Sequence, residues 1–197
     1  VWNASRFVLM NVSRRGEIDP GKLEIADKWI LTRLQEALRD ISDHMEDGDF
    51  GLAATRIYDF AWSEFCDWYI ELSKARLLGE DGESKNTAKA VLLYVLESLL
   101  KLLHPFMPFL TEQVYKYLPG SEGFLMLQKW PEYKAEFCYP EEEKKMAGVM
   151  EIIRTIRNLR SEMNVAPSKR THLILLPAEG WAETLKNGEG YFMRLAG

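Results

Sequence analysis

Three side chains suited to nucleic-acid binding stand close together in the segment ADKWILTRLQEALRDISDHM, residues 26–45. On a helical wheel its apolar residues form one stripe, and Lys28 and Trp29 fall outside this stripe on opposite sides. If Asp27 caps the helix, both residues occupy the first turn, where free backbone N–H groups favour an anion. An exposed indole there can stack on an unpaired base while the ammonium group contacts phosphate. Arg33, one turn beyond Trp29, extends the same surface.

A second group of suitable side chains lies at the start of the chain. Asn3 and Arg6 are one helical turn apart and Phe7 is adjacent, so an amide and a guanidinium that can read base edges stand beside an aromatic ring. In the alternative interpretation, the Trp29 indole packs inside the protein against a neighbouring helix or the loop 14–24, as most aromatic residues do. Spacing alone leaves both interpretations open.

Positive charge is concentrated in one part of the sequence, although the formal net charge of the whole chain is −5. Residues 144–170 contain seven Lys or Arg residues and two Glu residues, so their local charge is seven minus two, or +5. Within this segment Arg154, Arg157 and Arg160 recur every third position, opposite an apolar side. Such a stripe is either a solvated helix face or a track for phosphates. Net charge alone therefore does not exclude a nucleic-acid partner.

Residue patterns typical of catalysis or metal binding are missing from the sequence. No histidine follows a carboxylate by three residues, as the metal pairs of helical bundles require. There is no G-x-S-x-G elbow and no glycine-rich phosphate loop. Cys66 and Cys138 form no C-x-x-C pair, so neither zinc nor a disulfide framework is expected, and a reducing cytoplasm fits best. Asp40 and His44 form at most a surface ion pair, and we predict no catalytic residue and no metal site.

The hydrophobic periodicity predicts helices nearly throughout the chain. The predicted helices cover about 1–13, 26–46, 50–78, 84–104, 109–118 and 144–163, and Ser84 or Asn86 is expected to cap the fourth. A strand is predicted in THLILLP, residues 171–177, before a helical start at Trp181. The predicted fold is mainly α, with a helical bundle over 1–140 and a linking helix plus a truncated small α/β segment over 141–197. Both ends look cut from a longer chain, and neither a signal peptide nor a membrane span is recognisable.

Five segments in this order resemble a known family. WNASRF, DKWILTRL, WSEFCDWYIELSK, LLKLLHPFMPFLTEQVY and KWP are similar to the anticodon-binding region of class I aminoacyl-tRNA synthetases of the valine, isoleucine, leucine and methionine branch. The segments EFCDWYIE and IRNLRSEMNVAPSKR resemble the valine-specific members in particular. The similarity covers essentially the whole chain.

This resemblance implies a helical bundle that recognises the anticodon region of tRNA(Val) for a valine–tRNA ligase. The parent enzyme would use ATP and Mg²⁺ in an upstream catalytic domain, so this part carries no cofactor and no catalytic residue, and it would act in the cytoplasm as a monomer. The implied tRNA contacts are Asn3, Arg6, Phe7, Lys28, Trp29 and Arg33, with backbone contacts from Arg154, Arg157, Arg160, Lys169 and Arg170. Two alternatives remain at this point: a helical protein-interaction module that docks a partner helix, and a metal-dependent bundle enzyme.

Overall fold

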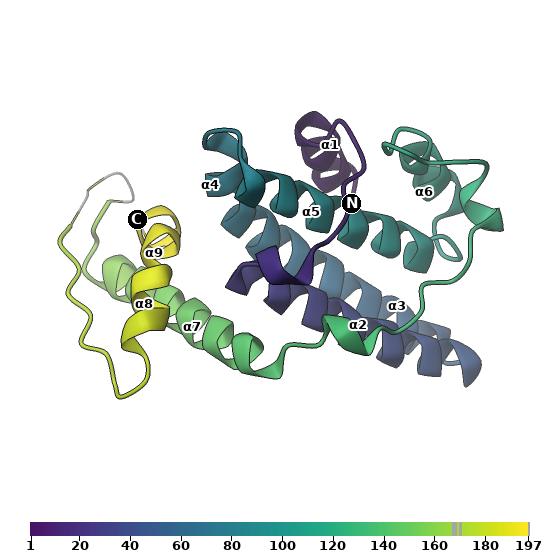
Figure 1. Ribbon diagram of the computed structural model, residues 1–197. Helices are drawn as coiled ribbons and strands as arrows, with labels where there is room; N and C mark the ends of the chain where they lie inside the picture. Colours follow the sequence, from purple (N-terminus) through teal and green to yellow (C-terminus); the bar gives the residue numbers. More distant parts are fainter. Residues whose placement is uncertain (167–168, 170, 197) are drawn as a thin grey trace. The chain divides into compact units, whose positions relative to one another are not determined.

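A computed structural model describes residues 1–166, 169 and 171–196 (Figure 1). The chain divides into two compact units, Val1–Tyr139 and Pro140–Gly197, which are described separately. The first unit contains α1 (Trp2–Asn11), α2 (Ile25–Glu46), α3 (Phe50–Asp59), the π-helix η2 (Phe60–Ile70), α4 (Glu71–Leu78), α5 (Glu83–Leu103) and α6 (Pro108–Tyr115). Three short 3₁₀ helices, η1 (Pro20–Lys22), η3 (Leu125–Leu127) and η4 (Ala135–Phe137), lie in its connections.

Helix α5 is the centre of the first unit, because α1, α2, α3, α4 and α6 all pack against it. Its apolar side chains are buried around most of its circumference. Residues 50–78 form one uninterrupted helical segment, whose middle part, η2, widens into π-helical turns. The rings of Phe60, Phe65 and Tyr69 on η2 are fully buried. Helix α1 packs against α5 at the edge of the bundle (Figure 1).

The start of α2 differs from the prediction. The helix begins one turn earlier than an Asp27 cap would place it, because Glu24 is the N-cap and Asp27 is the third helical residue of a capping box. Asp27 is fully buried and accepts hydrogen bonds from Tyr69 Oη at 2.7 Å and from Arg76 Nη1 at 2.8 Å. The predicted cap role of Asp27 is therefore wrong, since its carboxylate holds α2 against η2 and α4.

The start of α5 also differs from the prediction, which placed its cap at Ser84 or Asn86. The N-cap is Gly82 and Ser84 lies inside the first turn. Instead of capping, the Ser84 hydroxyl donates to Glu24 and accepts from Arg76 Nε at 2.8 Å. The two cap predictions, at Asp27 and at Ser84, failed for the same reason. Each side chain forms hydrogen bonds with residues distant in sequence instead of capping its own helix.

The second unit consists of α7 (Pro140–Glu162), α8 (Ala182–Asn187) and α9 (Glu189–Leu195). The Trp181 indole contacts α7 at Gly148, where a Cβ atom would come within 2.2 Å of Cη2 of the ring. Gly148 is thus required for this close approach.

The prediction of a small α/β segment is wrong, because the described residues of the structure contain no β-strand. Residues 171–177 have no regular secondary structure. A strand forms only when a second extended segment accepts and donates its backbone hydrogen bonds, and the alternation of side chains does not supply that partner. Ile174 and Leu176 are 84% and 90% exposed, so the apolar residues on one side of the segment face solvent. Among the helices of the described residues, none is long and apolar enough to cross a membrane.

Candidate nucleic-acid interface

The outer face of α1 presents three of the predicted contact residues. Asn3 and Arg6 are exposed and Phe7 is half-buried. At 100° per residue the three side chains occupy one side of the helix, since positions 3, 6 and 7 are related by one turn. Within the part of the chain that the structure describes, no ion pair or hydrogen bond engages the Arg6 guanidinium. An amide, a guanidinium and a ring therefore share one solvent-facing surface.

Lys74 on α4 completes this surface, and the sequence interpretation did not include it. Its ammonium nitrogen lies 5.6 Å from the centre of the Phe7 ring, which is within cation–π range. Lys74 also forms an ion pair with Glu71, one turn earlier on the same helix. The contact with Phe7 joins positions 67 residues apart, so no local spacing indicates it. We call Asn3, Arg6, Phe7 and Lys74 the α1 surface.

The Trp29 side chain is only 4% exposed, so the expectation that it faces solvent is wrong. The helical wheel failed because α2 is covered on more than one side. The chain returns over it at residues 134–139, where Gln35 Oε1 accepts from Lys134 N at 2.7 Å and Thr32 Oγ1 accepts from Tyr139 N at 2.8 Å. Helix α2 also packs against α3, η2 and α5, so more of its circumference is covered than its one apolar stripe indicates. In this structure the indole cannot stack on an RNA base.

The other two predicted residues of α2 have partners inside the bundle. The Lys28 ammonium lies 5.4 Å from the centre of the Tyr139 ring. The Arg33 guanidinium forms two hydrogen bonds of 3.0 Å with the Glu64 carboxylate and a further ion pair with Glu36. Such a bidentate pair orients α2 against η2.

Helix α4 lies between the two predicted groups. Its residue Lys74 points towards α1, whereas Arg76 binds Asp27 on α2. Residues two positions apart on a helix point in nearly opposite directions, about 200° apart. The structure therefore brings Lys74 to Phe7 on α1, whereas Lys28 contacts Tyr139 and Arg33 binds Glu64 and Glu36.

The predicted basic residues of the second unit have several different environments. Arg154 and Arg157 are exposed on α7, where Arg154 pairs with Glu151 at 3.4 Å and the Arg157 Nε donates to the Leu195 carbonyl. Arg160 donates to Thr171 Oγ1 at 3.0 Å and to the Lys169 carbonyl at 2.8 Å, so it holds the segment after α7. The Lys169 side chain is exposed, and Arg170 lies outside the described residues.

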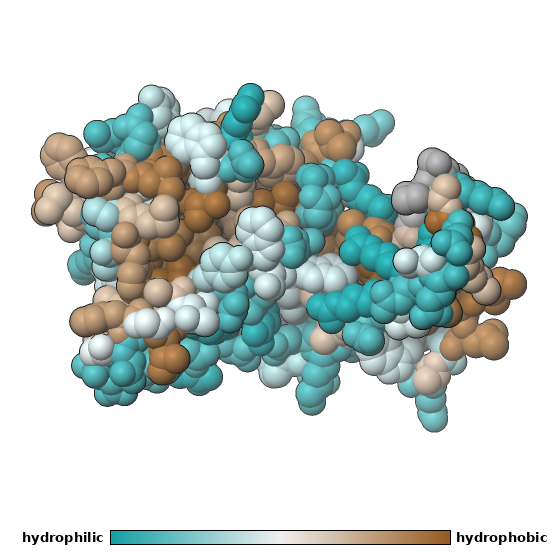
Figure 2. Space-filling model, turned by 180° about the vertical axis from the view of Figure 1, so that it is seen from behind, coloured by the Kyte–Doolittle hydropathy of each residue, from teal (hydrophilic) through white to brown (hydrophobic). Residues whose placement is uncertain are grey.

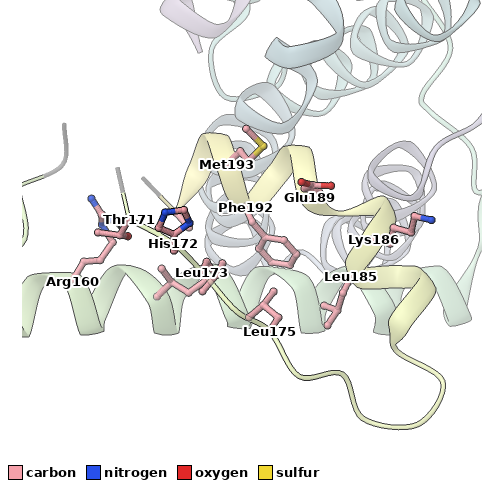
Figure 3. A pocket seen from close by; sticks show the side chains of 12 residues that line it. Arg160, Thr171, His172, Leu173, Leu175, Leu185, Lys186, Glu189, Phe192 and Met193 are labelled. Carbon is pink, nitrogen blue, oxygen red and sulfur yellow. Dashed lines mark hydrogen bonds between the residues drawn. The ribbon is translucent and has the colours of Figure 1, made fainter. Parts of the chain in front are cut away.

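A hollow of about 570 Å³ opens in the second unit between α7, residues 171–175 and α8–α9 (Figure 3). Its floor is apolar, and Phe192, Leu175 and Leu185 point into it. Lys186 and Glu189 stand at its rim. Thr171 and His172 also line the hollow, and the Thr171 hydroxyl accepts a hydrogen bond from Arg160 Nη1 at 3.0 Å.

Two other reactive groups, His104 and Cys66, are half-buried in the first unit. His104 Nδ1 lies 2.8 Å from Thr111 Oγ1 and so joins the end of α5 to α6. Burial raises the pKa of the Cys66 thiol above its ordinary value, which makes it a poor nucleophile. Among the described residues, no three His, Cys, Asp or Glu side chains are grouped so that they could hold a metal ion.

Comparison with known proteins identifies the family of this chain. The sequence model of the family described as "Anticodon-binding domain of tRNA ligase" matches residues 27–175, and the chain belongs to this family. Its relatives include the valine–tRNA ligase of Clostridium tetani, 45% identical over 199 residues that cover 100% of this chain and 22% of that protein. The corresponding enzyme of Clostridium acetobutylicum is 41% identical over 201 residues, 100% of this chain and 23% of that protein. That of Carboxydothermus hydrogenoformans is 45% identical over 190 residues, 95% of this chain and 21% of that protein. The chain therefore spans about a fifth of the length of these relatives.

Proposed function

We propose that the α1 surface binds the anticodon loop of tRNA(Val) and so positions this tRNA for a valine–tRNA ligase. The observation that carries this proposal is that exposed Asn3 and Arg6 share one side of α1 with the half-buried Phe7 ring, which Lys74 contacts. Single-stranded RNA loops are recognised by side chains that stack on splayed bases and bind their edges, and cations next to them contact phosphates. In a full ligase, catalytic residues outside this chain would use ATP and Mg²⁺. We place that ligase in the cytoplasm and propose that it acts as a monomer.

The remaining predicted residues take secondary places in the proposal. Lys28 is half-buried and contributes a positive charge near the start of α2. Arg154 and Lys169 are exposed and are proposed as backbone contacts of the second unit. The Arg33 guanidinium binds Glu64 and Glu36, so its proposed role is to hold α2 in place beside the RNA.

A binding experiment with an isolated anticodon arm tests this proposal. The 197-residue chain is titrated with a fluorescein-labelled 17-nucleotide stem–loop that carries the valine anticodon UAC, and with the same stem–loop carrying a different anticodon. We expect tighter binding of the valine loop and about 5- to 50-fold weaker binding for Asn3→Ala and Phe7→Leu. For Lys74→Met we expect a loss on both loops and a salt slope that is smaller by about 0.7–0.9.

The matched control is Lys129→Met, which removes an exposed lysine from the connection after α6. It should leave the binding of the valine loop unchanged within a factor of two. Equal affinity of both stem–loops, or α1-surface variants that bind as tightly as the parent, would contradict the proposal.

A second candidate function, docking of a protein, is favoured by one observation. Large apolar side chains of α6 and residues 124–127 lie exposed, among them Phe109, which is 91% exposed, and Met126 and Leu127. Apolar surface gathers on the left of Figure 2, the side on which α6 lies when the view of Figure 1 is reversed. Exposed patches of this kind mark contact surfaces. Binding to such a partner should persist at raised salt and without RNA, whereas binding of an RNA loop weakens with salt.

A further inference from the structure

A small groove lies between α1 and the end of α6, next to the α1 surface. It has a volume of about 230 Å³ and is lined by Trp2, Arg6, Leu9, Met10, Val114 and Tyr117. The ring of Trp2 comes from α1 and that of Tyr117 from the turn after α6, and the two residues are 55% and 64% exposed. The groove thus has an apolar lining and two accessible aromatic rings, which a closed bundle core does not require.

The composition of the groove favours a planar, electron-rich and anionic occupant. Arg6 is the one charged residue of its lining, and no carboxylate of the described chain pairs with that guanidinium. A guanidinium beside two aromatic rings suits a nucleotide, since the rings can stack on the base and the cation can contact the phosphate. A helix of a partner protein is about 10 Å across and is too large for this volume.

Continuity with the α1 surface supports the same occupant. Arg6 belongs both to the groove and to the face that carries Asn3 and Phe7. Position 6 follows position 3 by about one turn, or roughly 5 Å along α1. An RNA loop that contacts Asn3 and Phe7 would therefore bring a neighbouring nucleotide to the mouth of the groove.

We propose that the groove between α1 and α6 binds one unpaired base of the RNA loop, with Trp2 and Tyr117 as stacking partners and Arg6 at its phosphate. This inference rests on the proposed function and adds a base-binding pocket to it. The contacts are noncovalent, and the base enters because a splayed nucleotide has already lost its stacking in the loop. A stacking contact of this kind should change the dissociation constant about 5- to 150-fold.

A fluorescent base analogue tests the pocket directly. The anticodon stem–loop is prepared with 2-aminopurine at one loop position at a time, and its emission is followed while the 197-residue chain is added. We expect strong quenching at one loop position, because aromatic stacking quenches this fluorophore. Trp2→Leu and Tyr117→Leu should abolish the quenching and weaken binding about 5- to 150-fold, whereas Tyr117→Phe, which keeps the ring, should retain both.

The matched control is Trp62→Leu. Trp62 on η2 is also 55% exposed, but it stacks on Tyr58 of α3 and does not line the groove. It should change neither the quenching nor the affinity, and far-UV circular dichroism verifies that all variants are folded. If the stem–loop binds through Asn3 and Phe7 but Trp2→Leu and Tyr117→Leu quench and bind like the parent, the pocket is refuted and the proposed function stands. Absence of any stem–loop binding would overturn both.

Discussion

The buried carboxylate of Asp27 allows a quantitative test of how the bundle holds α2 in place. Asp27 accepts from Tyr69 Oη at 2.7 Å, from Arg76 Nη1 at 2.8 Å and from the Glu24 backbone N–H at 3.0 Å. The Arg76 side chain is itself only 10% exposed. Substitution of Asp27 therefore leaves a cation with reduced access to water and without its main partner.

The magnitudes of two substitutions follow from these contacts. Asp27→Asn preserves the shape of the side chain but removes its charge, and loss of one partner of a buried ion pair costs about 3–5 kcal/mol. Tyr69→Phe removes one hydrogen bond to a charged group and leaves Arg76 paired, which costs about 1.5–3 kcal/mol. In the double variant Asp27→Asn/Arg76→Met no unpaired buried charge remains, so its destabilisation should be smaller than the sum of the two single substitutions.

The assay is urea-induced unfolding followed by far-UV circular dichroism, with the free energy of unfolding obtained at 25 °C. A slope that stays constant among the variants ensures that midpoints report stability. The reasoning is refuted if Asp27→Asn destabilises the protein by less than Tyr69→Phe does, or if the double variant is less stable than the two single substitutions predict by addition.

Three further predictions concern stability. Trp29→Ala should lower the free energy of unfolding by about 3–5 kcal/mol, as expected for a buried indole, and a loss below about 0.5 kcal/mol would show that the ring is solvent-exposed. Burial raises the pKa of Glu97, but hydrogen bonds from Lys101 and Arg15 outweigh this effect, so its pKa is lowered from the ordinary 4.5. Because the charged form is favoured in the folded state, its contribution is present above pH 4.5 and is lost as the pH falls through the lowered pKa. Glu97→Gln should therefore destabilise the protein by about 1.5–3 kcal/mol at pH 7 and by progressively less below pH 4.5, and a pH-independent difference in urea unfolding would contradict this cause. Gly148→Ala should displace the Trp181 ring, since a Cβ atom would lie 2.2 Å from Cη2, and faster proteolysis of residues 171–187 is the expected readout.

Sequence periodicity predicted the helices well because each is stabilised by contacts that repeat along its own segment. Residues 50–78, expected as one helix, are helical without interruption. Periodicity did not indicate the π-helical turns of η2, which preserve the helical rod and alter only its internal hydrogen bonds. The wrong features were those determined by residues far away in the chain.

Trp29 and the segment 171–177 illustrate this limit. A helical wheel assumes that one side of a helix meets solvent. Residues 134–139, which are about 100 positions later in the sequence, form hydrogen bonds with α2 on a side that the wheel assigned to solvent. The alternation in THLILLP is compatible with a strand, but strand formation depends on a partner segment that the pattern does not contain. In both cases the local pattern was read correctly and the neighbour was unknown.

Part of the candidate site was accessible from the sequence. The spacing of Asn3, Arg6 and Phe7 placed an amide, a cation and a ring on one side of a helix, and these residues share the outer side of α1 in the structure. Lys74 and Tyr117 were not accessible, because α4 and α6 meet α1 only after the bundle has folded. Sequence spacing can thus group residues that lie on one helix, whereas residues from different helices are brought together only by the fold.

Photochemical crosslinking tests the central claim most directly. A valine anticodon stem–loop with 5-iodouridine at single loop positions is irradiated in complex with the 197-residue chain, and the linked peptides are identified by mass spectrometry. The α1 surface predicts crosslinks to peptides that contain residues 2–11 and Lys74. Crosslinks confined to the second unit, or to the segment around Lys28 and Trp29 without any to α1, would contradict it.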